Sequence, residues 1–171
     1  RPGSSLPTIN VDADHVRGAQ REAWARWAAI DPVAAPWVAL LDDVTDAWNA
    51  HDVAKVRACF ADDLTVEDHR LAGLGRIEGA DRYMDSFVAL WALAPDQRLE
   101  FGQSCAIDRH GAVFTLRRAG TLESGGAFEN EYAWLALARD GRITRLELFE
   151  IGTLDAALAR LDELRAASIT T

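Results

Sequence analysis

The last third of the chain contains four consecutive stretches in which apolar and polar residues alternate, and this feature constrains the fold most. The stretches cover residues 98–107, 112–122, 127–139 and 142–151. Alternation with a period of two is typical of half-buried strands. The joints are short, and the last is the dipeptide Asp140-Gly141, which favours a tight hairpin. We therefore predict an antiparallel four-stranded meander.

In most of the rest of the chain, the spacing of apolar residues is typical of helices. Apolar spacings of three and four residues predict helices over residues 12–29, 36–49, 52–60, 80–94 and 153–166. Asp62 and Asp63 are predicted to form a polar turn, and residues 1–10 a loose lead-in. We divide the chain into an N-terminal arm and helix, residues 1–35, and a main domain, residues 36–171.

A further strand is predicted directly after that turn. Leu64 and Val66 alternate with polar residues, and if they face the core, Asp68 and Arg70 face it too, whereas His69 points away. A carboxylate on the apolar face of a strand is costly unless it is paired or used. Asp68 is therefore the strongest candidate for a functional residue, as a buried ion pair, a ligand anchor or a general base.

This order of helices and strands predicts an α+β fold. The economical arrangement is a cone-like curved antiparallel sheet wrapped around helices, with an extra N-terminal helix. A pocket can remain between the helices and the concave face of the sheet.

Composition excludes several classes of protein. The net charge of −9 argues against nucleic-acid and anionic-membrane binding, and no apolar run reaches the roughly 20 residues that span a bilayer. Cys59 and Cys105 are interpreted as unpaired thiols in a reducing compartment, which predicts a cytoplasmic protein. No pair of histidines or cysteines has the spacing of metal ligands, so we predict neither a metal nor a cofactor.

Three local motifs support the cone. They are Phe60-Ala-Asp-Asp-Leu-Thr-Val-Glu-Asp68, Gly79 before a helix, and Asp140-Gly-Arg-Ile143 before the last strand. Together, over roughly residues 38–165, they resemble ketosteroid isomerases and, more broadly, nuclear transport factor 2-like and polyketide cyclase-like domains. The resemblance implies a fold that hosts enzymes, ligand binders and dimerisation modules alike.

The resemblance carries over to the catalytic residues only in part. In the isomerases, an aspartate at the end of this first strand is the base that moves the steroid proton, and Asp68 matches it. The tyrosine and the protonated aspartate that donate to the oxyanion fall on Val44 and Ala133 here. Removing such a donor costs about 3–4 kcal/mol of transition-state stabilisation. We therefore do not predict steroid isomerase activity.

Several further residues are predicted to surround the pocket. By the expected strand register, Arg117, Glu131 and Glu150 point inward and form a charged cluster with Asp68, either as an ion-pair network or as a ligand clamp. Arg70 is expected at the mouth of the pocket. The aromatic wall is assigned to Trp48, Phe87 and Trp91.

The same register places six apolar residues on the outer face of the sheet: Phe114, Leu116, Phe128, Tyr132, Trp134 and Phe149. Such a patch is too apolar to be left in water. We predict a two-fold homodimer through this face. The alternative is that the N-terminal helix, with Trp24 and Trp27, covers it.

The function predicted from the sequence is a small-molecule-pocket and dimerisation module, non-enzymatic or with only vestigial catalysis, either alone or as part of a larger regulator. The alternative is an isomerase-, hydrolase- or cyclase-type enzyme without a cofactor. It would act on a small apolar substrate with Asp68 as general base. Arg117, Glu131 or Glu150 would assist Asp68, and His69 is a further candidate for this role. A third interpretation is a protein-interaction domain that uses the sheet face and needs no pocket.

Overall fold

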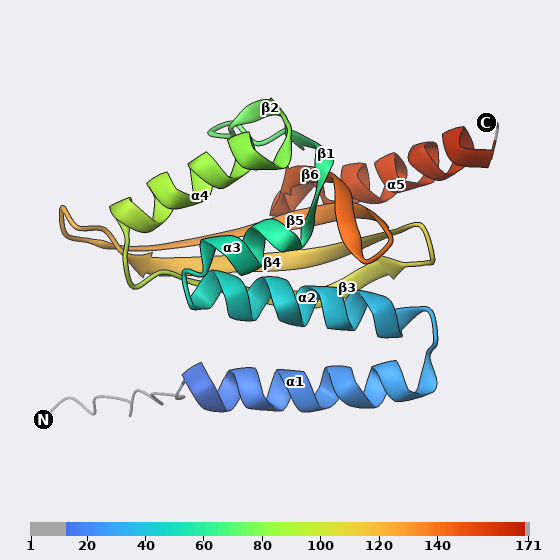
Figure 1. Cartoon of the computed structure of the whole chain (residues 1–171), viewed down its shortest axis with the longest axis horizontal. Coiled ribbons are helices and arrows are strands. Elements are labelled where there is room, and N and C mark those ends of the chain that lie inside the picture. The colour runs from blue at the N-terminus through green and yellow to red at the C-terminus, as the bar shows by residue number, and fades with distance from the viewer. Residues whose placement is uncertain (1–12, 170–171) are drawn as a thin grey trace, which may run out of the picture.

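The structure is a computed structural model that describes residues 13–169. The predicted lead-in over residues 1–10 lies outside the described residues. Figure 1 shows the arrangement of the helices and strands. In chain order these are α1 (Ala13–Ile30), α2 (Ala34–Asn49), α3 (Val53–Ala58), β1 (Phe60–Asp68), β2 (Gly75–Glu78), α4 (Ala80–Leu93), β3 (Arg98–Ile107), β4 (Gly111–Thr121), β5 (Ala127–Arg139), β6 (Arg142–Glu150), a short 3-10 turn (Ile151–Thr153) and α5 (Leu154–Ile169).

The six strands form one curved, unclosed sheet in the order β2-β1-β6-β5-β4-β3. β1 runs parallel to β6, and the other neighbours are antiparallel. α2 and α4 pack on the concave side, α1 lies alongside α2, and α5 packs on the opposite face of β4, β5 and β6 (Figure 1). The predicted α+β cone is confirmed.

The core has one apolar cluster on each side of the sheet. The inner cluster joins α2 and α4, through Trp48 and Phe87, to the concave face of the sheet. The outer cluster joins Leu135 and Phe149 of the sheet to Leu161 of α5. Both faces of the middle strands are therefore buried. Antiparallel sheets commonly have one buried face and one solvated face instead.

The predicted facing of β4 and β5 is wrong by one residue. Leu116 and Trp134 belong to the inner cluster, whereas Ala133 and Leu135 belong to the outer one. A shift of one residue exchanges the two faces of a strand. The alternation of residues along β5 does not show which of its two faces is the concave one, because the outer face, which packs against α5, is apolar as well. β1 and β6 face as predicted, with Asp68 inside and Phe149 outside.

This correction removes the apolar outer patch. Of the six residues predicted there, Phe114, Leu116, Tyr132 and Trp134 lie in the inner cluster, and Phe149 is covered by α5. The N-terminal helix does pack on residues of this set, since Trp24 contacts Phe114 as well as Phe101, with ring centroids 6.4 and 6.5 Å away, but it does so on the inner side of the sheet. The predicted homodimer stays a prediction, but it loses this argument.

The segment around β1 also differs from the prediction. Asp62 and Asp63 lie within β1 and not in a turn, because β1 already begins at Phe60. Its pairing with β6 is interrupted between Phe60 and Thr65, and both carboxylates point to solvent at that irregularity. The loop after β1, which carries Gly73, Gly75 and Gly79, contains the short strand β2, which pairs with β1.

Candidate functional site

A small cavity lies in the cone between α2, α4 and the concave face of the sheet. Its volume is about 40 Å³, which admits water molecules but is far below the roughly 300–1,000 Å³ of pockets for drug-sized ligands. Three predicted pocket residues, Trp48, Phe87 and Arg70, line it. Trp91 does not line it but packs behind Trp48, with ring centroids 5.2 Å apart.

Asp68 lies on the concave side, as its strand position predicts, but it does not line the cavity. Its side chain has no exposed surface. Arg70 Nε donates to one carboxylate oxygen at 2.8 Å and Arg70 Nη2 to the other at 2.7 Å. The backbone N–H of Leu74 adds a third bond at 2.9 Å. A Cβ at Gly73 would come within 2.5 Å of this carboxyl group, so the loop after β1 can close over Asp68 only with glycine there.

The electrostatics of this pair do not favour a general base. Burial alone would raise the pKa of Asp68, but the bonds from Arg70 and from the Leu74 N–H outweigh it and hold the pKa below its usual value. A general base needs a pKa near the operating pH and contact with the substrate. In this conformation the Asp68 carboxylate has neither.

The polar groups that do line the cavity are mainly hydrogen-bond donors. Arg70 lies over the ring of Tyr132, 4.3 Å from its centroid. Burial raises the pKa of both Tyr83 and Tyr132, so their phenols stay protonated. The indole N–H of Trp48 is buried without a hydrogen-bond partner. The cavity therefore offers apolar walls and several donors to an oxygen-bearing molecule.

Arg118 is a candidate site residue that the sequence did not reveal. It lines the cavity, and its Nε is buried without a partner. Within residues 17–167 it is the only partly buried arginine without a carboxylate partner. The sequence pattern predicts that Arg117 points inward, and the one-residue difference in register places Arg118 there instead. The prediction named Arg117, but the arginine on the concave side is the next residue, Arg118.

The predicted cluster of Asp68 with Arg117, Glu131 and Glu150 does not form. Arg117 lies on the outer face, where its Nε is 2.7 Å from Glu129 and its Nη1 is 3.2 Å from Glu100. Glu131 pairs with Arg117 across β4 and β5 and shares that face. Glu150 accepts a bond from the Leu71 N–H at 3.1 Å.

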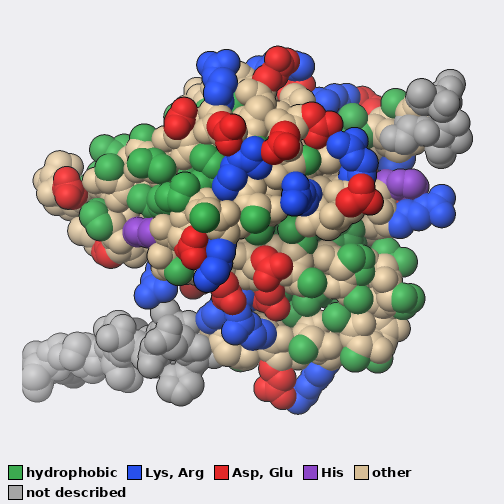
Figure 2. Space-filling view, viewed as in Figure 1, with side chains coloured by type: hydrophobic (Ala, Val, Ile, Leu, Met, Phe, Trp, Pro, Cys, Tyr) green, Lys and Arg blue, Asp and Glu red, His purple; other side chains and the backbone are tan. Residues whose placement is uncertain are grey.

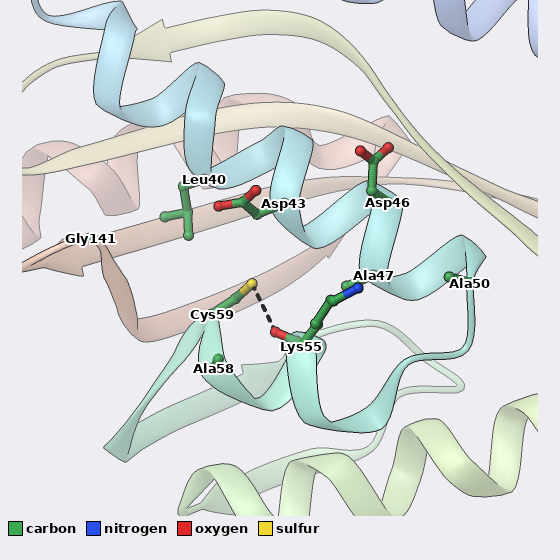
Figure 3. Close-up of a pocket in the computed structure, with 9 residues that line it drawn as sticks. All are labelled: Leu40, Asp43, Asp46, Ala47, Ala50, Lys55, Ala58, Cys59 and Gly141. Atoms are coloured by element: carbon green, nitrogen blue, oxygen red, sulfur yellow. Dashed lines mark hydrogen bonds between the residues drawn. The ribbon is translucent and has the colours of Figure 1, made fainter.

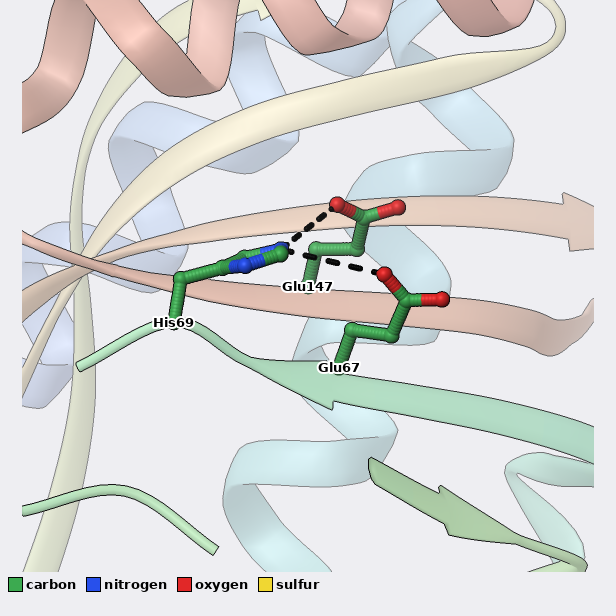
Figure 4. A group of neighbouring side chains, drawn as sticks. All are labelled: Glu67, His69 and Glu147. Atoms are coloured by element: carbon green, nitrogen blue, oxygen red, sulfur yellow. Dashed lines mark hydrogen bonds and ion pairs between the residues drawn. The ribbon is translucent and has the colours of Figure 1, made fainter. Parts of the chain in front are cut away.

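A different charged cluster lies on the outer side of β1 and β6 (Figure 4). Its three potential metal ligands are Glu67, His69 and Glu147, with ligand atoms within 4.8 Å of one another. His69 Nε2 lies 2.9 Å from Glu147, and its ring stacks on Phe149 at 4.5 Å. His69 thus points away from Asp68, as its strand position predicts. Glu147 comes from a distant strand, so no short sequence motif marks the group.

Arginines make this cluster an ion-pair network. Arg145 donates to both Glu67 and Glu147, at 2.8 and 2.6 Å, and Arg160 of α5 donates to Glu147 at 3.2 Å. Burial would raise the pKa of Glu147, but bonds from His69, Arg145 and Arg160 outweigh it and lower the pKa. Cations already neutralise these carboxylates, which leaves little charge to attract a metal ion.

A larger hollow lies elsewhere, between α2, α3 and the turn from β5 to β6 (Figure 3). It is open and has a volume of about 590 Å³. Cys59 borders it, with its Sγ 3.4 Å from the Lys55 carbonyl oxygen. Burial, reinforced by Asp43, raises the pKa of the Cys59 thiol to about 11. A thiol of that pKa is not an activated nucleophile.

Comparison with known proteins identifies the family. The model of the SnoaL-like domain matches residues 41–146, more than half of the chain, so this protein belongs to the SnoaL-like domain family. The fold and the resemblance to NTF2-like and ketosteroid isomerase-like proteins are thereby confirmed.

No curated protein matches the chain. No helix within residues 13–169 is both long and apolar enough to cross a membrane.

Solved structures with the same fold are distant in sequence. A candidate SnoaL-like polyketide cyclase from Jannaschia sp. CCS1 has 16% identity and a TM-score of 0.59, covering 70% of this chain and 88% of that one. A candidate polyketide cyclase from Sinorhizobium meliloti has 24% identity and a TM-score of 0.52, covering 64% and 92%. TerC, co-crystallised with polyporic acid, has 15% identity and a TM-score of 0.55, covering 72% and 98%.

Proposed function

We propose that this protein binds a small, mainly apolar organic molecule with an acceptor oxygen inside the cone. The observation that carries the proposal is the convergence of donors on one apolar cavity: Arg70 and Arg118, the phenols of Tyr83 and Tyr132, and the unpartnered indole N–H of Trp48. Buried donors without partners cost free energy in the empty protein. A ligand oxygen that accepts from them would recover it.

Binding requires the cavity to expand from about 40 Å³. The movable wall is the segment between β1 and β2, which contributes Leu74 to the cavity and leaves Leu71 fully exposed. Leu71 itself has few buried contacts, but an outward movement of this segment breaks the bonds from the Leu71 N–H to Glu150 and from the Leu74 N–H to Asp68, a cost that ligand binding has to offset. Asp68 and Arg70 would anchor its first residues.

Two of the structural neighbours support a ligand of this chemistry. TerC was crystallised with polyporic acid, and the Jannaschia protein is named as a candidate polyketide cyclase. The second name also favours the alternative function, an enzyme of cyclase type. In that alternative Asp68 must leave Arg70 to act as a base, and an Asp68→Asn variant would lose turnover while keeping ligand affinity.

The experiment is a thermal-shift screen of small aromatic ketones and acids against the full chain. Two variants, Val44→Phe and Leu116→Phe, fill the cavity from opposite walls. Ile30→Phe is the control, because Ile30 is exposed and distant from the cavity. We expect at least one compound to raise the melting temperature of the wild type and of Ile30→Phe, but not of the filled variants. Equal shifts in all four proteins, or no shift in any, contradict the proposal.

The homodimer is the second part of the predicted function and is proposed here without the apolar-face argument. Sedimentation velocity over a hundredfold range of concentration tests it. A dimer mass that persists on dilution supports it, and a concentration-independent monomer contradicts it.

A further inference from the structure

A second cleft lies where the C-terminal half of α4 meets the hairpin between β4 and β5. Figure 2 shows hydrophobic side chains gathered over this end of the molecule, at the left of the view. The cleft has a volume of about 220 Å³. Its apolar walls include Leu93, which is 59% exposed, and Leu122, which is 37% exposed. We call it the hairpin cleft.

The floor of the hairpin cleft is polar and unsatisfied. Gln97, only 2% exposed, lines it, and its side-chain amide nitrogen has no hydrogen-bond partner. Arg118 lines it too, with its buried Nε equally unpartnered. Most buried polar groups in proteins are hydrogen-bonded. Two buried, unpaired donors on residues that line the same cleft, whose other polar residue is Asn130, therefore point to a missing acceptor.

The backbone holds Gln97 in this place. A Cβ at Gly120 would lie 2.8 Å from the Gln97 Cα, so β4 can approach Gln97 this closely only with glycine at position 120. Asp96 accepts a bond from the Thr121 N–H at 2.7 Å, which ties the same segment to the end of β4. The backbone at Gln97 is thus held against the end of β4, and this contact fixes the place of Gln97 in the floor of the cleft.

The charge of Arg118 defines the kind of acceptor. No carboxylate within residues 17–167 pairs with its guanidinium, which lies over the Phe128 ring, 5.9 Å from its centroid, and acts electrostatically on the phenols of Tyr83 and Tyr132. A partly buried cation without a counterion is costly. A carboxylate can accept from the guanidinium and from the Gln97 amide together.

We propose that the hairpin cleft binds a small organic monoanion. Its carboxylate contacts Arg118 and Gln97, and its apolar body packs on Leu93 and Leu122. The volume of about 220 Å³ suits a molecule smaller than a typical drug. The inference rests on the proposed function only in that Arg118 borders both spaces, and it holds even when the inner cavity stays closed.

The test uses two probes of matched shape, naphthalene-2-carboxylate and the neutral 2-acetylnaphthalene, with binding to the full chain measured by calorimetry. We expect the carboxylate to bind more tightly. Arg118→Met should weaken carboxylate binding about tenfold or more, because a hydrogen bond to a charged group is lost. It should weaken ketone binding by a smaller factor, because a neutral oxygen accepts a weaker hydrogen bond from Arg118. Gln97→Met should weaken carboxylate binding by a smaller factor. Arg82→Met, which removes an exposed arginine of α4, is the control and should have no effect.

The cavity-filling variant Leu116→Phe separates this inference from the proposed function. Leu116 lines the inner cavity but not the hairpin cleft. If Leu116→Phe keeps carboxylate binding and Arg118→Met loses it, the anion occupies the cleft. If Leu116→Phe abolishes binding, the anion lies in the inner cavity, and the inference is overturned while the proposed function stands. Equal carboxylate affinity in wild type and Arg118→Met also overturns the inference.

Discussion

Arg117 and Arg118 are neighbours in β4, yet their guanidinium groups lie on opposite sides of the sheet in opposite electrostatic surroundings. Arg117 lies between Glu100 and Glu129 on the outer face. Arg118 lies on the concave side, with a buried Nε that has no partner. Arg117 is therefore stabilised by its surroundings, whereas the unpaired Arg118 lowers the free energy of unfolding.

The first prediction concerns the stability of two matched variants. Arg118→Met should raise the free energy of unfolding by about 1 kcal/mol, because it removes an unsatisfied buried donor. Arg117→Met should lower it by about 0.5 kcal/mol, since exposed ion pairs contribute little. Urea unfolding at neutral pH measures both. A loss of stability in Arg118→Met would mean that a partner not seen in the structure satisfies this arginine.

The phenol of Tyr132 should be dispensable for stability. No hydrogen bond of this hydroxyl is present within residues 17–167, and the Arg70 guanidinium contacts the ring, which phenylalanine retains. Tyr132→Phe should therefore change the free energy of unfolding by less than about 0.5 kcal/mol. The same variant should weaken binding of a ketone probe about threefold to tenfold. A destabilised Tyr132→Phe protein would contradict the description of the phenol as an unused donor.

Cys59 should be nearly inert towards alkylation. Its thiol pKa of about 11, against an ordinary value of 9.0, reduces the thiolate fraction at pH 8 about a hundredfold. In a Cys105→Ser background, iodoacetamide should modify Cys59 slowly, and the rate should rise about tenfold per pH unit towards pH 10. The same variant in urea provides the control, where the rate should be that of an ordinary thiol. Rapid modification of the folded protein at pH 8 would contradict the raised pKa.

Local patterns were sufficient for the fold and for most element bounds. The alternation in residues 98–151 predicts β3 to β6 to within about one residue. Asp52 caps α3 by accepting from the Lys55 N–H at 3.0 Å, a local bond of the kind that marks helix starts. These features depend on residues close in the chain. β2 was missed because four residues of a glycine-rich loop carry no clear period.

The site could be predicted only in part, because its geometry depends on contacts between distant residues. Val113 and Phe114 are both buried, one beneath α5 and the other beneath the inner helices. No alternation in β4 itself can tell which of two buried faces is concave. The sequence feature that indicates two buried faces is the apolar stripe of α5, because Ala157 and Leu161 can be buried only if α5 packs against a face of the sheet. That Gln97 and Arg118 lack partners is visible only from interatomic distances.

The last prediction concerns Asp68 as a structural anion. Asp68→Asn keeps the shape of the side chain but leaves Arg70 half-buried without its counterion. Breaking such a pair should lower the free energy of unfolding by about 3–5 kcal/mol. The control is Asp62→Asn, whose side chain is 86% exposed and pairs with Arg57, and it should cost no more than about 0.5 kcal/mol. Urea unfolding at pH 7 compares the two variants.

The sign of the pH dependence follows from the lowered pKa of Asp68. A carboxyl group whose pKa in the folded state lies below its ordinary value of 3.8 stabilises the fold above that pH. The contribution is lost as the pH falls from about 3.8 through the folded-state pKa. Wild type should therefore lose more stability than Asp68→Asn between pH 5 and pH 2. Parallel losses in both proteins would show that Asp68 is not held as an anion, and would return it to candidacy as a general base.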